Sequence, residues 1–409
     1  MISNRGKKSK ITLISIVVAC LLFLPGCWGK REVEKLAPLF GIGIDLGEKP
    51  ATFLITVQFA MPKKGDASGA EIEDRTISIE ASSAREAFEK VSKVTFRTPF
   101  LGSLNVIIIG EDLAKEGGFN DILDFNQRFS EFRRTMYVVL AKGKAQDILN
   151  SELRSGSLPS MHIKNMIESG EEVSNFPTVR LGHYLTILAT KSTAPIFPVL
   201  ESVKSGEGIE YKAIGNDEAG EMRLQGAGVF NGDRLEDFLT DQETKGYMWM
   251  ENEVSQRLID TVDLEENSVS FGGRVLKSTT KYKVNAKSGK MELQYLISAT
   301  ITINEVIGLK KQLSGAEWVE LTKEAESNFA KVIRKECESS LKKQRELELD
   351  FLGIGRHIEQ KNSTYWKTIK DQWKEEIEDF PVSLEVQVRV HNTGLSSSSA
   401  VNSTGEGQE

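Results

Sequence analysis

The side chains best suited to nucleophilic or metal chemistry are few, since the chain has three cysteines and four histidines among 409 residues. The sequence contains no Gly-x-Ser-x-Gly nucleophile elbow and no Gly-x-x-x-x-Gly-Lys-Ser/Thr phosphate loop. A pair of carboxylates that acts as in a glycosidase stays an open alternative, because the spacing of two residues in the sequence does not fix their distance in the fold. These patterns predict a protein that is not an enzyme and that holds no metal and no cofactor. None of the histidines has a second His or a Cys at the spacing of a zinc site; they are His162, His183, His357 and His391.

Cys27 is the exception, because it directly follows a short apolar segment that ends Leu24-Pro25-Gly26. The fourteen residues 11–24 are almost entirely apolar, and basic side chains precede them. As a helix they would span roughly 21 Å, short of the roughly 30 Å core of a bilayer. This favours a secretory signal peptide over a membrane span. The Cys resembles that of a bacterial lipobox, which implies cleavage before Cys27 and a thioether-linked diacylglycerol on its sulfur. An ordinary signal peptide and an uncleaved anchor helix stay as alternatives.

Cleavage at that point would change the charge balance of the protein. The whole chain carries 52 Lys and Arg against 59 Asp and Glu, a net charge of −7. Residues 1–26 hold four basic and no acidic side chains, so the remaining 383 residues carry 48 against 59, a net charge of −11. An acidic body argues against nucleic-acid binding and against adhesion of the whole body to anionic lipid. The lipid on Cys27 would therefore do the tethering, since two acyl chains suffice for stable anchoring.

Gly41, Gly43 and Gly47 give their segment a superficial likeness to a phosphate-binding loop. Residues 40–45 and 52–61 alternate apolar side chains around a short polar turn, which predicts a β-hairpin. A dinucleotide loop must instead lead into a helix whose N-terminus meets the phosphates. The sequence therefore favours a structural hairpin, with Asp45 at the end of its first strand.

The remaining patterns predict a mixed α/β (α+β) fold: a lipid-anchored, three-domain body with mixed β-sheets and a long C-terminal helix. Strands alternate with amphipathic helices up to about residue 190, and the longest helical pattern spans residues 314–350 and has Cys337 on its apolar stripe. We expect Cys337 to be a small buried hydrophobe. The predicted segments are a signal peptide (1–26), a tether (27–38), an N-terminal α/β domain (39–200), a β-rich middle domain (201–305), a C-terminal α/β domain with the long helix (306–393) and a disordered tail (394–409).

Three tryptophans stand in patterns that allow two interpretations. Trp249 lies in Lys-Gly-Tyr-Met-Trp-Met, and Trp366 and Trp373 are seven residues apart on a predicted helix over 365–377. Such a stripe is typical of a buried core, and it is also typical of a partner-binding face, where Trp, Tyr and Met are enriched. Both interpretations stay open at this point.

The order of several blocks resembles the Ger(x)C family of spore-germination lipoproteins. Two departures are Gly29, where the family usually has Asp, and Lys245, where it has Arg. Each block alone is modest, but five in order over about 370 residues are specific. The blocks are residues 24–33, residues 41–45 with 57–59, residues 226–235, residues 245–250, and residues 350–355 with Trp366, Trp373 and Pro381.

This resemblance implies a protein that is lipid-anchored on the outer face of the spore inner membrane. It implies assembly with the A and B subunits of a nutrient germinant receptor, and no known enzyme activity. Cys27 would be the lipid attachment site. We also expect that the bend at Gly353 and Gly355 orients the long helix and shapes a docking surface. The candidate interaction or structural residues are Asp45, Trp249, Gly353, Gly355, Arg356, Trp366 and Trp373.

Two other classes of protein share the predicted anchor. A solute-binding lipoprotein of a transporter should have two similar α/β lobes about a cleft, and the unequal halves of this chain speak against it. An anchored hydrolase would need a catalytic constellation that the sequence does not indicate.

Overall fold

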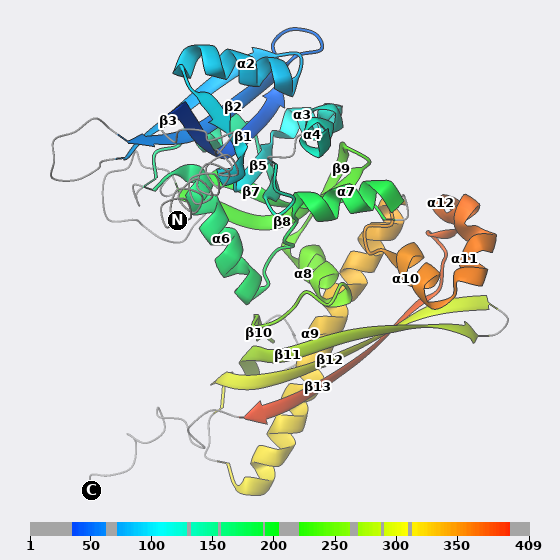
Figure 1. Ribbon diagram of the computed structural model, residues 1–409. Helices are drawn as coiled ribbons and strands as arrows, with labels where there is room; N and C mark the ends of the chain where they lie inside the picture. The colour runs from blue at the N-terminus through cyan, green and yellow to red at the C-terminus, as the bar shows by residue number, and fades with distance from the viewer. Residues whose placement is uncertain are drawn as a thin grey trace, which may run out of the picture.

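The described residues of the computed structural model form two β-sheets that are joined by helices (Figure 1). The first sheet lies at one end of the molecule, and the second sheet and a long helix lie at the other. Among these residues no helix is both long and apolar enough to cross a bilayer. The structure describes residues 35–62, 72–128, 132–153, 157–190, 193–203, 221–261, 269–287, 290–309 and 313–392. Cys27 and the predicted signal peptide and tail therefore lie outside the described residues.

The first sheet is mixed, with a parallel centre and antiparallel flanks. Its strand order is β3-β2-β1-β5-β6-β7-β8-β9, with β4 pairing to β1. Strands β1, β5, β6 and β7 run parallel, as expected where helices connect them. The strands are β1 (Leu36–Leu46), β2 (Phe53–Pro62), β3 (Ile72–Ala81), β4 (Thr98–Phe100), β5 (Val106–Ile109), β6 (Tyr137–Ala141), β7 (Ile196–Val203), β8 (Glu221–Asn231) and β9 (Arg234–Leu239).

Helices cover both faces of this sheet, and each face has a core of its own. One core joins α2, α3, α4 and α7, and the other joins α5 and α6. The central strand β5 has no polar side chain and is buried on both faces, as a parallel strand between helices should be. The helices are α2 (Ala84–Thr95), α3 (Glu111–Glu116), α4 (Phe119–Arg128), α5 (Ala145–Leu149), α6 (Pro159–Val173) and α7 (Leu181–Thr190).

The second sheet is built on a long hairpin. β11 (Ser270–Lys287) and β12 (Lys290–Ile307) pair antiparallel over most of their length, β10 (Leu258–Asp260) pairs with β11, and β13 (Val382–Asn392) runs parallel to β12. Helix α9 (Gly315–Leu347) packs along this sheet, and its N-terminal end extends past the strands (Figure 1).

Short helices fill the space between the two sheets. They are α8 (Asp241–Met250), α10 (Ile354–Lys361), α11 (Ser363–Ile369), the 3₁₀ turn η3 (Lys370–Gln372) and α12 (Trp373–Glu376). α8 crosses α9, and its residues share a hydrophobic core with both sheets.

The prediction of a mixed α/β fold with mixed sheets and a long C-terminal helix is confirmed. β8 and β9 extend the first sheet beyond residue 200, and β13 joins the strands of the predicted middle segment. The domain boundaries at 200 and 305 stay predictions. The helix expected over 365–377 is interrupted, since α11 ends at Ile369 and the 3₁₀ turn η3 separates it from α12.

Candidate functional site

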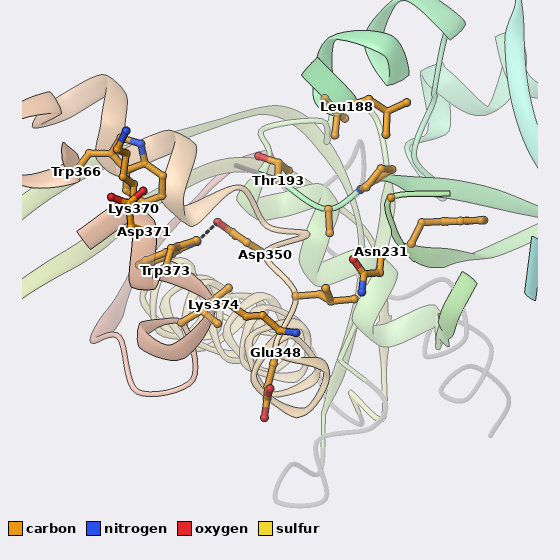
Figure 2. A pocket seen from close by; sticks show the side chains of 17 residues that line it. Leu188, Thr193, Asn231, Glu348, Asp350, Trp366, Lys370, Asp371, Trp373 and Lys374 are labelled. Atoms are coloured by element: carbon orange, nitrogen blue, oxygen red, sulfur yellow. Dashed lines mark hydrogen bonds between the residues drawn. The ribbon is translucent and has the colours of Figure 1, made fainter. Parts of the chain in front are cut away.

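A cavity of about 440 Å³ lies at the junction between the two sheets. Figure 2 shows that the end of α9 and the segment after it form one wall, α11 and α12 a second, and residues 193–195 and the β8–β9 turn a third. Both candidate tryptophans of this region, Trp366 and Trp373, line the cavity, and charged side chains stand around it: Glu348, Asp350, Lys370, Asp371 and Lys374.

Asp350 forms hydrogen bonds to three of the segments around this cavity. One carboxylate oxygen accepts from the Ile354 amide at 2.7 Å, and the other accepts from the Gly355 amide at 2.6 Å. The second oxygen also accepts from Trp373 Nε1 at 3.0 Å, as Figure 2 shows. The Asp350 carbonyl oxygen accepts from the Ala194 amide, in the segment that leads into β7. Burial raises the pKa of Asp350 to about 6, although these hydrogen bonds favour its charged form. Asp350 therefore caps α10 and also holds α12 and the first sheet to it.

The two candidate glycines beside Asp350 are required for different reasons, Gly353 by its backbone conformation and Gly355 by close packing. Gly353 has φ +61°, which favours glycine. At Gly355 a Cβ would lie 2.6 Å from Trp366 Cη2 and 2.9 Å from Trp373 Nε1. The two indole rings meet edge to face with centroids 5.3 Å apart. The structure thus brings both glycines and both tryptophans into one packed cluster.

Arg356 and His357 point from α10 toward α8 and the second sheet. Arg356 pairs with Glu251, and His357 Nε2 lies 3.5 Å from the other oxygen of that carboxylate. His357 also shares a hydrogen bond of 3.0 Å with the Tyr295 hydroxyl and stacks on Tyr282. Burial raises the pKa of Glu251 to about 7, although the Arg356 guanidinium opposes it, and burial lowers the pKa of His357 to about 3. This arrangement keeps His357 neutral inside the junction.

Trp249 lies apart from that cluster, on α8, and is fully buried. Its Nε1 donates to one Glu336 oxygen at 2.7 Å, and the Arg257 guanidinium pairs with the other. The Arg257 guanidinium carbon also lies 5.4 Å from the centroid of the Trp249 ring. Gly246 allows this approach, because a Cβ there would lie 2.1 Å from the Glu336 carbonyl oxygen. The block at residues 245–250 is therefore the place where α8 crosses α9.

The sequence analysis missed Glu336 and Arg257. A signal for Glu336 exists, since it falls on the apolar stripe of α9, three residues after Ile333 and seven after Phe329. An acid at such a position needs a buried partner. No comparable pattern singles out Arg257.

Asp45 is a structural residue of the first sheet. Its carboxylate oxygens accept from the Ala145 and Gln146 amides, each at 2.8 Å, so it caps the N-terminus of α5. Burial raises its pKa, while the two amide hydrogen bonds lower it. The nearby Gly43 gives α5 room, because a Cβ would lie 3.0 Å from the Ala145 methyl. Gly41 and Gly43 thus belong to a hairpin that packs closely on α5 and α6.

The remaining reactive side chains take no part in a common site. Cys337 is buried in the α8–α9 contact, as predicted, and burial raises the pKa of its thiol well above the usual value. Across the described ranges, no group of three or more His, Cys, Asp and Glu side chains could hold a metal ion. The buried carboxylates of Asp350, Glu251 and Glu336 are each bound to an amide, an indole or a guanidinium, so their chemistry here is pairing and capping.

The fold and its buried junction define a two-sheet α/β protein in which the candidate residues hold helices together. Comparison with known proteins specifies the class further. Residues 29–202 match the family model of the spore germination protein N-terminal domain, and residues 225–394 match that of the spore germination B3/GerAC-like C-terminal domain. The chain belongs to this family of spore germination proteins, the Ger(x)C family that the sequence blocks resembled.

Several relatives from Bacillus subtilis (strain 168) match almost the whole chain. Spore germination protein KC is 27% identical over 399 residues, covering 94% of this chain and 96% of the relative. Spore germination protein B3 is 23% identical over 390 residues, covering 93% and 97%. The crystal structure of the GerBC protein covers 88% of this chain and 100% of that chain, with a TM-score of 0.54 and 19% identity, and so shows the fold alone.

Proposed function

We propose that this protein is a non-enzymatic, membrane-anchored subunit of a nutrient germinant receptor. It assembles with the A and B subunits on the outer face of the spore inner membrane, and a diacylglycerol on Cys27 holds it there. The observation that carries the proposal is the match of two germination-protein models, which together span the chain from residue 29 to residue 394. The lipobox sequence directly before the first matched residues supports the anchor.

The geometry of the junction supports a scaffold role. Four of the residues that the sequence singled out are buried and packed together beside Asp350: Gly353, Gly355, Trp366 and Trp373. A rigid body of this kind presents a fixed outer surface to partner subunits, which lowers the entropic cost of assembly.

Substitution of the anchor cysteine tests the proposal directly. We expect Cys27→Ala to abolish incorporation of labelled lipid and to lower nutrient germination, because a single uncleaved segment of fourteen apolar residues is a poor anchor. Cys337→Ala is the matched control, since Cys337 is buried in the α8–α9 contact, and we expect the labelling of this variant to be unchanged. Full membrane retention and full germination of the Cys27→Ala spores would refute the anchor.

Assembly needs a separate measurement. We expect the A and B subunits to co-purify with the tagged protein from spore membranes solubilised in mild detergent. Recovery of the protein alone, with intact A and B subunits elsewhere in the same membranes, would refute the subunit role while leaving the lipid anchor in place.

A solute-binding lipoprotein stays the second function, and the cavity of about 440 Å³ is the feature that favours it. Such proteins close two similar lobes around their ligand. In this protein the first sheet has nine strands and the second has four, so the two halves are not similar lobes. A common core also joins the two sheets. Tight binding of an amino acid or a sugar to the purified body in calorimetry would favour this function over the receptor subunit.

A further inference from the structure

Phe96 is the most unusual exposed residue of the described chain. It ends α2 with φ +53°, a left-handed conformation that a bulky aromatic residue rarely adopts. Phe96 is 91% exposed, and Val94, two residues earlier, is 58% exposed. Packing of the Phe96 ring therefore contributes little stabilisation to offset the free-energy cost of its left-handed backbone conformation. Such a combination of strain and apolar exposure is typical of a functional surface.

Phe96 lies close to the start of β1, which is near the first described residue of the chain. β4, two residues after Phe96, pairs with the first residues of β1, so that Thr98 lies opposite Leu36. The Arg97 guanidinium also donates to the Leu36 carbonyl oxygen at 3.4 Å. Lys35 follows Cys27 by eight residues, and eight residues reach at most about 29 Å. A lipid on Cys27 would therefore keep this end of the molecule close to the membrane.

The local charge differs from that of the whole body. Residues 84–97 carry four basic and two acidic side chains, whereas the chain after residue 26 has a net charge of −11. Lys93 and Arg97 flank the two exposed apolar residues. Basic residues beside exposed aromatic and aliphatic side chains suit the headgroup region of a membrane with anionic lipids.

We propose that the C-terminal end of α2 is a membrane seat, made of Val94 and Phe96 with Lys93 and Arg97. It rests in the headgroup region of the bilayer, where the Phe96 ring leaves water and the two cations meet lipid phosphates. This inference rests on the proposed lipid anchor, which supplies the first of the two signals that stable peripheral binding requires. With the seat on the membrane, the free end of α9, at the opposite end of the molecule, points away from it (Figure 1).

The test uses the full chain, produced in a bacterial host that processes lipoproteins and reconstituted into vesicles of phosphatidylethanolamine and phosphatidylglycerol. A bimane probe is attached to Phe96→Cys, and doxyl-labelled lipid is the quencher. Val319→Cys is the matched control, because Val319 is 54% exposed and lies near the free end of α9. The buried Cys337 thiol reacts slowly, so the label stays specific.

We expect the lipid to quench position 96 at least about threefold more strongly than position 319, since only position 96 would lie in the interface. The difference should shrink when phosphatidylglycerol is left out. Flotation of the same sample with the vesicles measures the anchor separately. Flotation with equal quenching at both positions would refute the seat and leave the anchor standing. Failure to float would refute the anchor, and the seat with it.

Phe96→Asn separates a membrane role from a structural one. Asn tolerates the left-handed conformation better than Phe, so we expect the unfolding temperature of this variant to match or exceed that of the unchanged protein. We also expect a bimane on Val94→Cys to lose at least about half of its quenching by lipid when Phe96 is Asn, because the ring is the main apolar contact. A lowered unfolding temperature, or unchanged quenching, would overturn the proposal.

Discussion

Gly355→Ala is the substitution whose effect the structure defines most sharply. The added Cβ would lie 2.6 Å from Trp366 Cη2 and 2.9 Å from Trp373 Nε1. Both indoles are buried, and Trp373 is also held by Phe380, with ring centroids 5.3 Å apart. Neither ring can turn away without moving α11 or α12. The Cβ would therefore push Trp373 Nε1 away from Asp350.

The expected loss of stability has two parts. Overpacking of a dense core costs about 1–3 kcal/mol. Loss of the hydrogen bond from the Trp373 indole to the Asp350 carboxylate costs about 1.5–3 kcal/mol more. Because relief of one part reduces the other, we expect the free energy of unfolding to fall by about 2–5 kcal/mol. Urea unfolding of the full chain, followed by tryptophan fluorescence, measures this change.

Gly315→Ala is the control for this experiment. A Cβ at Gly315, the first residue of α9, would meet no atom within 4 Å, so we expect a change within about 0.5 kcal/mol. If Gly355→Ala also stays within that range, the close packing described around Gly355 is wrong. If Gly355→Val is stable and leaves both germination and subunit co-purification unchanged, the bend at Gly353 and Gly355 does not shape a docking surface.

Two further predictions concern the buried charges. Arg257→Leu should lower the free energy of unfolding by about 3–5 kcal/mol, because it removes the cation that pairs with the buried Glu336 and leaves only the hydrogen bond from Trp249. Urea unfolding measures the loss. A change below about 1 kcal/mol, on the order of a surface pair, would contradict the burial of this pair. Burial raises the pKa of Glu251 to about 7 and that of Glu253 to about 8, so their contribution to stability is complete below about pH 4.5 and is lost as pH rises through about 8. Glu253→Gln should therefore flatten the fall in unfolding temperature between pH 5 and pH 9, and an unchanged slope would show that Glu253 is not the group that titrates.

The local patterns of the sequence predicted the elements whose periodicity is strong. The hairpin expected over residues 40–61 is β1 and β2, and the helix expected over 314–350 is α9. In α9 the buried face follows directly from the spacing of apolar residues, whereas both faces of the hairpin are covered, so that Thr56 and Gln58 are as buried as Val57. Ser314 at the N-cap and Glu317 three residues later also give α9 a capping box that the sequence shows.

The contacts between distant segments could not be predicted in this way. Strand β7 contains Pro198, which argues against a strand, yet a register shift between Pro198 and Leu200 accommodates it. Asp45 caps a helix that begins 100 residues later, and Glu336 meets a tryptophan 87 residues earlier. Such pairs depend on how the sheets pack. A single sequence carries no direct signal for that packing.

The core that surrounds Trp249 has a consequence for cooperativity. Ala227 and Leu239 come from the first sheet and Ile297 from the second, and all three belong to one buried cluster with α8 and α9. Separation of the two sheets would expose this shared cluster to water, and with it apolar side chains of both sheets. The two sheets should therefore melt in one transition. A force applied at either end of the protein should therefore move the described body as one unit.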